Sequence, residues 1–570
     1  MVDGGLLVAS RPRPMRRRQR RRRLLSRALP IVALAVFAGA VGAFITLSGG
    51  GDERRLVADY VTAWSHQEFP RMYGLLDRAS RRATTESRFA AEVSRAQATA
   101  TLVSLRAVRV GEVNRSTISV PMVLDTRIWG TLHEVLTVPL RGSGSDARIH
   151  LGPTLLFPGL TGRERLHRTI AMPPRGTLLA GDGTPLAQGP TRSSPIPDVA
   201  GQIVGTVGPI PADEAATYLG RGYRAGAQVG LDGLERIFES RLIGRPGGRL
   251  LAGHRTLANV RAIQATAIQT TISPALERAA VAAMGGKYAG IAVMNPRTGA
   301  LVALAGIAFS ALQPPGSTMK IVTAAGALQA GITTLSTVYP IQSSATLSGV
   351  QLQNASGESC GGTLLNAFAV SCNSVFAPLG ARLGARRLVA VAERFGFNQP
   401  SPILGAAEPT IPAASAIGDD LAVGSSAIGQ GLVQATPLAM ADVGATIAMG
   451  GRRPIPTLLA HQRPRFIRVV SGHVAREVQQ MMVAVVRFGT GVSAQIPGVV
   501  VAGKTGTAEL KNTTQPGQSG AQNTDAWFVG YAPVGHPRYV AAALFPNQGA
   551  GAATAAPPIH DVLAAALGGG

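Results

Sequence analysis

The sequence is poor in several residue types, and each shortage excludes a class of protein. Only two of its 570 residues are cysteine, 15% are charged and 5% are aromatic. Two cysteines are too few for a small scaffold held together by disulfides, and 15% is too little charge for a highly charged disordered chain. Hydrophobic residues make up 46% of the chain, which is enough to build real cores. At ~100–200 residues per domain, this length predicts roughly three to five folded domains.

Acidic residues are few relative to basic ones, and the basic excess is unevenly placed. The 55 Lys+Arg residues against 31 Asp+Glu give a net charge of +24. Ten arginines lie within residues 1–27, where Asp3 is the only acid. Such a tail suggests nucleic-acid binding, but no aromatic residue is interleaved with the arginines and the run stops at a hydrophobic segment. We therefore expect no nucleic-acid partner.

That hydrophobic segment, residues 28–47, is 20 residues long and carries no charge. An apolar helix of this length crosses a bilayer core of ~30 Å. Because the arginines precede it, we expect a single-pass anchor in the cell membrane, with the N-terminus in the cytoplasm and the remaining chain extracytoplasmic. A cleaved signal peptide is the alternative, since Ala40, Gly42 and Ala43 are small enough for cleavage. The run exceeds the usual ~7–15 apolar residues of such a peptide, which favours the anchor.

Three regions with different patterns follow the apolar segment. Residues 52–160 begin with the periodicity of an amphipathic helix over 52–76 and continue with alternating, β-branched segments, which predicts a small α+β domain. Residues 165–268 are rich in turn signals and predict a β-rich pedestal that links its neighbours. Residues 269–570 combine strand-like stretches with a long helical middle, which predicts one large α/β domain. The fold class is therefore α/β, in a multidomain α+β chain.

The two cysteines, Cys360 and Cys372, lie in the part of the chain expected outside the cell. An oxidising exterior favours a disulfide between them, and an unpaired buried pair is the alternative. They have no nearby pair of histidines, so their spacing makes a poor zinc site. We expect no metal.

Lysine is scarcer still, because only four of the 55 basic residues are lysine: Lys287, Lys320, Lys504 and Lys511. Arginine cannot lose its proton in a protein, whereas a buried lysine can. Lys320 follows Ser317 by three residues at the predicted start of a small, apolar helix, which places both side chains on one face. A lysine in such surroundings can activate the serine as a nucleophile; the alternative is a helix-capping serine beside a solvated lysine.

Two further short motifs stand in the same region. Ser371 and Asn373 begin a helical stretch, where a hydroxyl and a carboxamide on one turn could relay a proton and bind a substrate amide, or simply cap the helix. Lys504, Thr505, Gly506 and Thr507 continue a β-rich stretch. A lysine and two hydroxyls there suit a peptide carboxylate, and the glycine would let a ligand approach the backbone; a solvated strand lysine is the alternative.

The three motifs in this order resemble the set found in β-lactamases and penicillin-binding proteins. Residues 269–570 are similar to the transpeptidase domain of class B penicillin-binding proteins. One departure is Cys372 at the middle of the second motif, where another form of the motif has aspartate; this position varies in the family. The resemblance implies a penicillin-binding transpeptidase-like fold on a β-rich pedestal, with a small cone-like N-terminal domain and one transmembrane helix. Other segments that resemble the family are Asn295–Ala300, Gly429–Gly431, Asp525–Tyr531 and, in the pedestal, Gly230–Glu235. The segment Tyr60–Tyr73 resembles a nuclear-transport-factor-like domain.

The resemblance implies serine acyl transfer without a metal or organic cofactor. Ser317 would attack the penultimate D-alanine of a peptidoglycan stem peptide, and Lys320 would act as the base. Ser371 would relay the proton to the leaving amine. The backbone N–H groups of Ser317 and Thr507 would form the oxyanion hole, at about 3–4 kcal/mol per donor.

The same resemblance implies how the substrate is held. Asn373 would bind a substrate amide, and Lys504 with Thr505, Gly506 and Thr507 would bind the terminal carboxylate. β-Lactams would acylate the same serine.

Alternatives of the same fold are a membrane-anchored β-lactamase or D,D-carboxypeptidase, in which water resolves the acyl-enzyme. A non-enzymatic β-lactam sensor would need a cytoplasmic output module, but the predicted cytoplasmic part is an arginine-rich tail of about 27 residues. Residues 52–268 are assigned to the two smaller domains, so we expect a monofunctional enzyme. A membrane glycosyltransferase in a wall-synthesis complex is the partner that class B membership implies.

Overall fold

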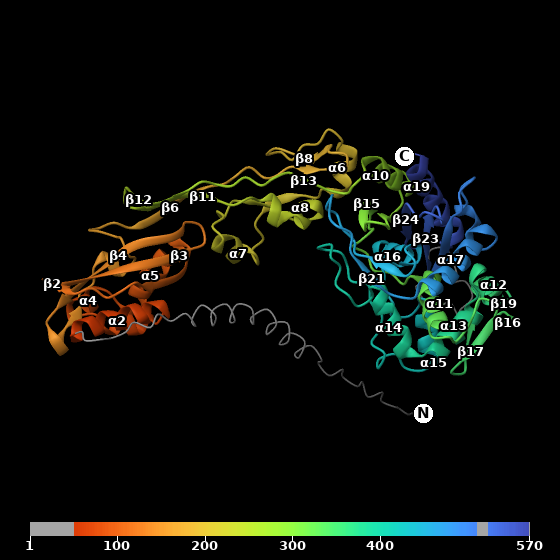
Figure 1. The fold of residues 1–570 in the computed structure, drawn as a ribbon, viewed down its shortest axis with the longest axis horizontal. Helices are drawn as coiled ribbons and strands as arrows, with labels where there is room; N and C mark the ends of the chain where they lie inside the picture. Colours follow the sequence, from red (N-terminus) through yellow and green to blue (C-terminus); the bar gives the residue numbers. More distant parts are fainter. Residues whose placement is uncertain (1–50, 510–522, 569–570) are drawn as a thin grey trace, which may run out of the picture. The chain divides into compact units, whose positions relative to one another are not determined.

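The computed structural model describes residues 51–509 and 523–568 (Figure 1). The predicted basic tail and membrane anchor, residues 1–27 and 28–47, lie outside these residues. In the part of the chain that is described, no helix combines the length and the apolar character needed to cross a membrane. The chain divides into two compact units, one formed by residues up to Pro173 with Ile210–Ala227 and Arg245–Ile263, the other by Pro174–Pro209, Gln228–Gly244 and Gln264 onward.

The first unit begins with helices and continues with a sheet, the order that its change of periodicity predicts. Tyr60, Trp64 and Phe89 are fully buried where the helices pack on the sheet. The one helix expected over 52–76 is two helices, because Gln67 takes a left-handed φ of 59° just after the first of them. The elements are α2 (Asp52–Ser65), α3 (Phe69–Gly74), α4 (Arg78–Ala83), α5 (Glu86–Ala100), β1 (Leu102–Ala107), β2 (Val113–Asn114), β3 (Thr117–Thr126), β4 (Gly130–Arg141) and β5 (Arg148–Ile149), in the strand order β1-β3-β4-β5 with β2 on β3.

Short sheets and helices make up the stretch from 165 to 268, which contributes segments to both units. The first unit contains β6 (Leu166–Ala171), α7 (Ala215–Gly220), β11 (Gly247–Ala252) and β12 (Arg255–Val260); the second contains β7 (Leu178–Leu179), β8 (Pro185–Ala187), α6 (Pro197–Ile203), β9 (Val207–Pro209), β10 (Gln228–Gly230), α8 (Gly233–Ile237), α9 (Glu239–Leu242) and β13 (Ile268–Gln269). In the second unit, buried Glu235 accepts hydrogen bonds from Arg175 and Arg192. The predicted domain boundaries, 52–160, 165–268 and 269–570, stay predictions.

A five-stranded antiparallel sheet forms the centre of the second unit, in the order β15-β14-β24-β23-β22. Its strands are β14 (Gly290–Asn295), β15 (Ala300–Gly306), β22 (Ala502–Glu509), β23 (Thr524–Ala532) and β24 (Tyr539–Phe545). Ile291 and Val293 face one core, while Ala292 and Met294 face the other, so both faces are covered. Strand β22 is an edge strand, and its outer row of backbone groups pairs with no other strand of this sheet.

Helices cover both faces of this sheet (Figure 1). Helices α10 (Pro274–Ala283) and α19 (Ala556–Gly568) pack on one face, and α16 (Pro437–Ala448) and α17 (Gly472–Arg487) pack on the other. Side chains on Thr436 and Ser471 cap the starts of α16 and α17. The remaining elements are η3 (Gly316–Met319), α11 (Lys320–Gln329), β16 (Val338–Gln342), β17 (Ser344–Leu347), β18 (Val350–Gln353), β19 (Cys360–Thr363), α12 (Leu364–Ala369), α13 (Asn373–Leu383), α14 (Ala385–Phe395), α15 (Asp420–Ala427), β20 (Arg452–Pro454), β21 (Phe466–Arg468) and α18 (Gly551–Thr554).

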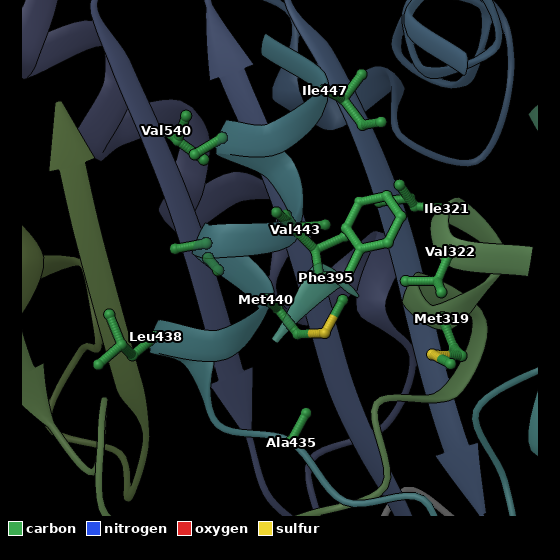
Figure 2. Close-up of a cluster of buried hydrophobic side chains, with 14 of the residues drawn as sticks. Met319, Ile321, Val322, Phe395, Ala435, Leu438, Met440, Val443, Ile447 and Val540 are labelled. Atoms are coloured by element: carbon green, nitrogen blue, oxygen red, sulfur yellow. The ribbon is translucent and has the colours of Figure 1, made fainter. Parts of the chain in front are cut away.

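Helix α11 is buried almost all round, which makes it a rigid support for the turn before it. Ile321 and Val322 of α11 pack in one cluster with Phe395 of α14 and with Met440 and Val443 of α16 (Figure 2). The turn η3 therefore leads into a helix that is held in place by side chains from two other helices.

Candidate active site

The serine of the first motif lies in a 3₁₀ turn rather than at the start of an α-helix. Gly316 begins this turn, η3, in the left-handed region with a φ of 52°, and the α-helix starts at Lys320. Residues three apart still share a face, because side chains eclipse at i and i+3 in a 3₁₀ turn. Ser317 is partly buried and Lys320 is fully buried.

The Lys320 ammonium nitrogen contacts the second motif. Its Nζ donates to the Ser371 carbonyl oxygen and to Asn373 Oδ1, both at 2.7 Å, and lies 3.3 Å from Ser371 Oγ. Burial, with the positive charge of Lys504 nearby, holds the pKa of Lys320 well below its usual range. Among the described residues, the Ser317 hydroxyl makes no hydrogen bond. Burial thus favours the neutral form of Lys320, which lies three residues after a serine whose hydroxyl is unengaged.

Ser371 connects the two buried lysines. Lys504 Nζ donates to Ser371 Oγ at 2.8 Å, across 133 residues of sequence, and to the Thr505 carbonyl oxygen at 3.0 Å. Burial lowers the pKa of Lys504 to about 7. Ser371 itself has a left-handed φ of 64°, which is unfavourable for any residue with a side chain. In this conformation its hydroxyl contacts both lysines. A proton can therefore pass between the lysines through one hydroxyl.

Both ends of the Asn373 carboxamide are engaged within the protein. Oδ1 accepts from Lys320 Nζ, and Nδ2 donates to the Gln353 carbonyl oxygen of β18 at 3.0 Å. A substrate amide that binds Asn373 must share or displace these contacts.

The third motif occupies the edge strand β22. Thr505 Oγ1 lies 2.6 Å from Thr490 Oγ1, and Thr507 Oγ1 accepts from the Gly551 N–H at 3.2 Å. Thr490 follows α17 and its N–H donates to the Ala369 carbonyl oxygen. No motif in the sequence identifies Thr490; its position between two glycines is the one local signal, and that signal indicates only a turn.

Gly506 makes room for packing within the protein, and its expected role beside a ligand stays a prediction. A Cβ at Gly506 would lie 2.8 Å from the Pro315 carbonyl oxygen and 2.9 Å from both Thr318 Cγ2 and Trp527 Cβ. The space beside Gly506 is therefore filled by the protein, and the missing side chain lets η3 pack against β22. Gly429 also contacts the start of η3, because its carbonyl oxygen accepts a hydrogen bond from the Gly316 N–H at 2.9 Å.

A disulfide joins Cys360 of β19 to Cys372, the residue between Ser371 and Asn373. Cys372 is buried and immediately precedes α13. The bond therefore fixes the turn that presents Ser371 to the two lysines.

Replacing both cysteines by serine is expected to lower the free energy of unfolding by about 2–3 kcal/mol, because a cross-link across a short loop no longer restricts the unfolded chain. The β-lactam acylation of Ser317 that the resemblance implies should slow as well, since the Ser371 turn loses its anchor. Thermal unfolding and acylation rates of the full chain measure both effects. A reductant should shift the wild type in the same direction and leave the double variant unchanged; an equal shift in both proteins would contradict this role.

The structure thus brings Ser317, Lys320, Ser371, Asn373 and Lys504 into one region of the second unit, with Thr505 and Thr507 on the adjoining edge strand. Of the other two lysines, Lys287 is exposed and Lys511 lies outside the described residues. Within residues 51–509 and 523–568, no three histidine, cysteine, aspartate or glutamate side chains gather where they could hold a metal.

Two protein families match separate parts of the chain. Residues 289–564 match the penicillin binding protein transpeptidase domain, and residues 182–267 match the penicillin-binding protein dimerisation domain. The second match overlaps the predicted pedestal.

Curated relatives share the same region. The chain is 37% identical over 294 residues to a peptidoglycan D,D-transpeptidase, PbpA, from Mycobacterium tuberculosis, across 46% of this chain and 56% of the relative. It is 32% identical over 281 residues to penicillin-binding protein PbpB from Mycolicibacterium smegmatis, across 44% of this chain and 42% of the relative. The matches therefore span about half the length of these relatives.

Solved structures extend the likeness to the fold. The PBPA structure from M. tuberculosis has a TM-score of 0.54 and 28% identity, across 69% of this chain and 99% of that chain. The same protein has been solved as an imipenem acyl-enzyme complex. The D,D-transpeptidase domain of a peptidoglycan glycosyltransferase from Eggerthella lenta has a TM-score of 0.56 and 28% identity, across 70% of this chain and 99% of that chain.

Proposed function

Because the chain belongs to the class B penicillin-binding proteins, we propose that it is a monofunctional peptidoglycan D,D-transpeptidase that cross-links stem peptides through an acyl-enzyme on Ser317. The observation that supports this most directly is the meeting of two fully buried lysines at one hydroxyl, Ser371 Oγ, beside a serine on η3. Burial lowers the pKa of Lys320 and so favours its neutral form, the form that a base needs for serine acyl transfer without histidine.

The proposed reaction begins with proton transfer from the Ser317 hydroxyl to the neutral Lys320 amine. Ser317 Oγ then forms a bond to the carbonyl carbon of the penultimate D-alanine. As the C–N bond to the terminal D-alanine breaks, the proton passes from Lys320 through Ser371 to the leaving nitrogen, a route supported by the 3.3 Å contact between Lys320 Nζ and Ser371 Oγ. An amine of a neighbouring stem peptide then attacks the ester, forms the cross-link and restores the Ser317 hydroxyl.

The edge strand supplies the proposed substrate contacts. A stem peptide would lie along β22, whose outer backbone groups are available for strand addition. Charged Lys504, with Thr505 and Thr507, would bind the terminal carboxylate, and Asn373 would bind a substrate amide. The N–H groups of Ser317 and Thr507 would hold the oxyanion. β-Lactams would acylate the same serine.

We extend the proposal to the location of the enzyme. The uncharged segment 28–47 after a basic tail supports a single-pass anchor with the catalytic region outside the membrane. Cross-linking acts on newly polymerised strands, so a membrane glycosyltransferase is the proposed partner.

Fluorescent penicillin tests the proposed chemistry on the full chain in detergent. Wild type should form an adduct that intact mass still detects after hours, and Ser317→Ala should form none. Ser336→Ala, which removes an exposed hydroxyl, is the matched control and should label like wild type. A folded wild type that forms no adduct would refute serine acyl transfer.

A second measurement separates transfer from hydrolysis. Incubation with a D-Ala-D-Ala donor peptide and an amine acceptor should release D-alanine and give the transfer product. Release without transfer would identify a carboxypeptidase, and clearance of the penicillin adduct within seconds would identify a β-lactamase.

A further inference from the structure

A cavity of about 260 Å³ lies in the second unit, away from the residues of the candidate active site. It is bounded by the end of α14, the loop that follows, α16, and strands β20 and β21. Its walls are mostly apolar. They include Phe397, Pro402, Leu438, Ile455 and Ile467.

The floor of the cavity is part of the rigid core. Phe395 and Leu438 line the cavity and also belong to the buried cluster that contains Met319 and Ile321 (Figure 2). Side chains packed at this density hold their positions without a ligand. The cavity is therefore formed before anything binds in it.

Two side chains of opposite charge, Asp442 of α16 and Arg453 of β20, line this apolar space. Asp442 Oδ1 and Arg453 Nε are both sealed from solvent, and neither has a hydrogen-bond partner. Among the described residues, no ion pair joins the two side chains, and the Arg453 guanidinium has no other partner. Burial raises the pKa of Asp442 to about 7, with Arg453 acting in the opposite direction.

The backbone makes room for the guanidinium at this wall. Gly396, which follows α14, has a φ of 115°, and a Cβ on it would lie 2.0 Å from Arg453 Nη1. The Arg453 guanidinium thus lies against the backbone of Gly396, which also lines the cavity. An unpartnered polar group in an apolar site costs about 1–3 kcal/mol, and each of these two residues of the cavity wall carries one such atom.

We propose that this cavity is a binding site for a free α-amino acid with an apolar side chain, whose carboxylate binds Arg453 and whose ammonium group binds Asp442. A simple anion would meet the Asp442 carboxylate, and a simple cation would meet the Arg453 guanidinium; a zwitterion satisfies both. The apolar walls accept the side chain. The volume is below the ~300–1,000 Å³ typical of larger ligands, which fits a single amino acid.

Ligand-observed NMR titration of the full chain in detergent tests the proposal with L-leucine and D-leucine as probes. At least one enantiomer should bind saturably. Its two halves, 4-methylpentanoate and 3-methylbutan-1-amine, should each bind at least ~10-fold more weakly, because each leaves one charged group unpaired. No saturable binding of either enantiomer would overturn the proposal.

Four variants test the assignment to these side chains. Arg453→Gln and Asp442→Asn should each weaken leucine binding at least ~10-fold. Arg452→Gln and Asp420→Asn remove exposed charges of the same types outside the cavity lining, and they should leave binding unchanged. Penicillin labelling of Ser317 at the wild-type level shows that each variant is folded.

Two results would contradict the assignment. If Arg453→Gln and Asp442→Asn both keep wild-type leucine binding, the amino acid binds elsewhere. If neither enantiomer binds and the two substitutions destabilise the protein non-additively, the side chains form only an internal ion pair.

Discussion

Replacing Lys320 by arginine is expected to slow penicillin acylation of Ser317 by ~10²–10⁴-fold, the range that a positioned general base contributes. Arginine stays charged at all accessible pH values and cannot accept the serine proton. Lys320 is fully buried, and its Nζ already has acceptors at 2.7 Å in Ser371 and Asn373, so the rate loss should reflect the missing base.

The rate of adduct formation by stopped-flow fluorescence measures this effect. Lys287→Arg is the matched control, because Lys287 is exposed and its replacement should leave the rate unchanged. Circular dichroism of the Lys320→Arg variant establishes whether the larger guanidinium is accommodated, and Lys320→Met supplies a second variant, which carries no charge and likewise cannot accept the proton. Acylation at the wild-type rate in a folded Lys320→Arg protein would show that Lys320 is not the base.

The same electrostatics predicts the sign of the pH dependence. Acylation needs neutral Lys320, so its rate should rise with pH through the lowered pKa of Lys320, well below the usual 10.5. Substrate binding needs charged Lys504, so kcat/KM should fall as pH rises above about 7. Lys320 feels both burial and the charge of Lys504, and it should lose its proton first. A bell-shaped profile is expected; a rate that rises steadily to pH 10 would contradict it.

The two lowered lysine pKa values also predict how the free energy of unfolding depends on pH. Both lysines bind fewer protons in the folded than in the unfolded state between their lowered pKa values and the ordinary value of 10.5. Unfolding therefore takes up protons in this window, and the contribution of these lysines to stability rises with pH across it.

The sequence could predict the parts of the site that depend on local spacing. Ser317 and Lys320 are three residues apart, and both helical and 3₁₀ geometry place residues at this spacing on one face, so the prediction does not depend on which kind of turn forms. The strands β14, β15 and β24 were similarly predictable, because short β-branched and apolar stretches between turns indicate buried strands. The scarcity of lysine in an arginine-rich chain distinguishes Lys320 and Lys504 from the other basic residues.

Contacts between distant residues could not be predicted in this way. Ser371 and Lys504 meet across 133 residues, and only the order of strands and helices determines that meeting. The contact of Thr490 with Thr505, and the packing of Pro315 into the space beside Gly506, depend on tertiary structure in the same way. The left-handed backbone of Ser371 is equally invisible to propensity, which disfavours it at any residue with a side chain.

Replacing Gly429 by alanine is expected to slow acylation of Ser317 by ~10²-fold, because a displacement of about 1 Å at a reacting group costs that much. A Cβ on Gly429 would lie 2.1 Å from the Gly316 carbonyl oxygen, on the residue before the nucleophile. The same substitution strains the hydrogen bond from the Gly316 N–H to the Gly429 carbonyl oxygen. Both effects displace η3 from β22 without removing any reacting group.

Gly431→Ala is a matched control two residues away. Gly429 and Gly431 have φ values of 76° and 70°, so alanine pays a similar left-handed backbone cost of ~1–2 kcal/mol at either position. A Cβ on Gly431 meets nothing within 4 Å, so Gly431→Ala should lower the melting temperature slightly and keep acylation within ~3-fold of wild type. The comparison isolates the contact with Gly316 from the cost of the backbone conformation. Equal acylation rates in the two folded variants would show that Gly429 does not position the nucleophile.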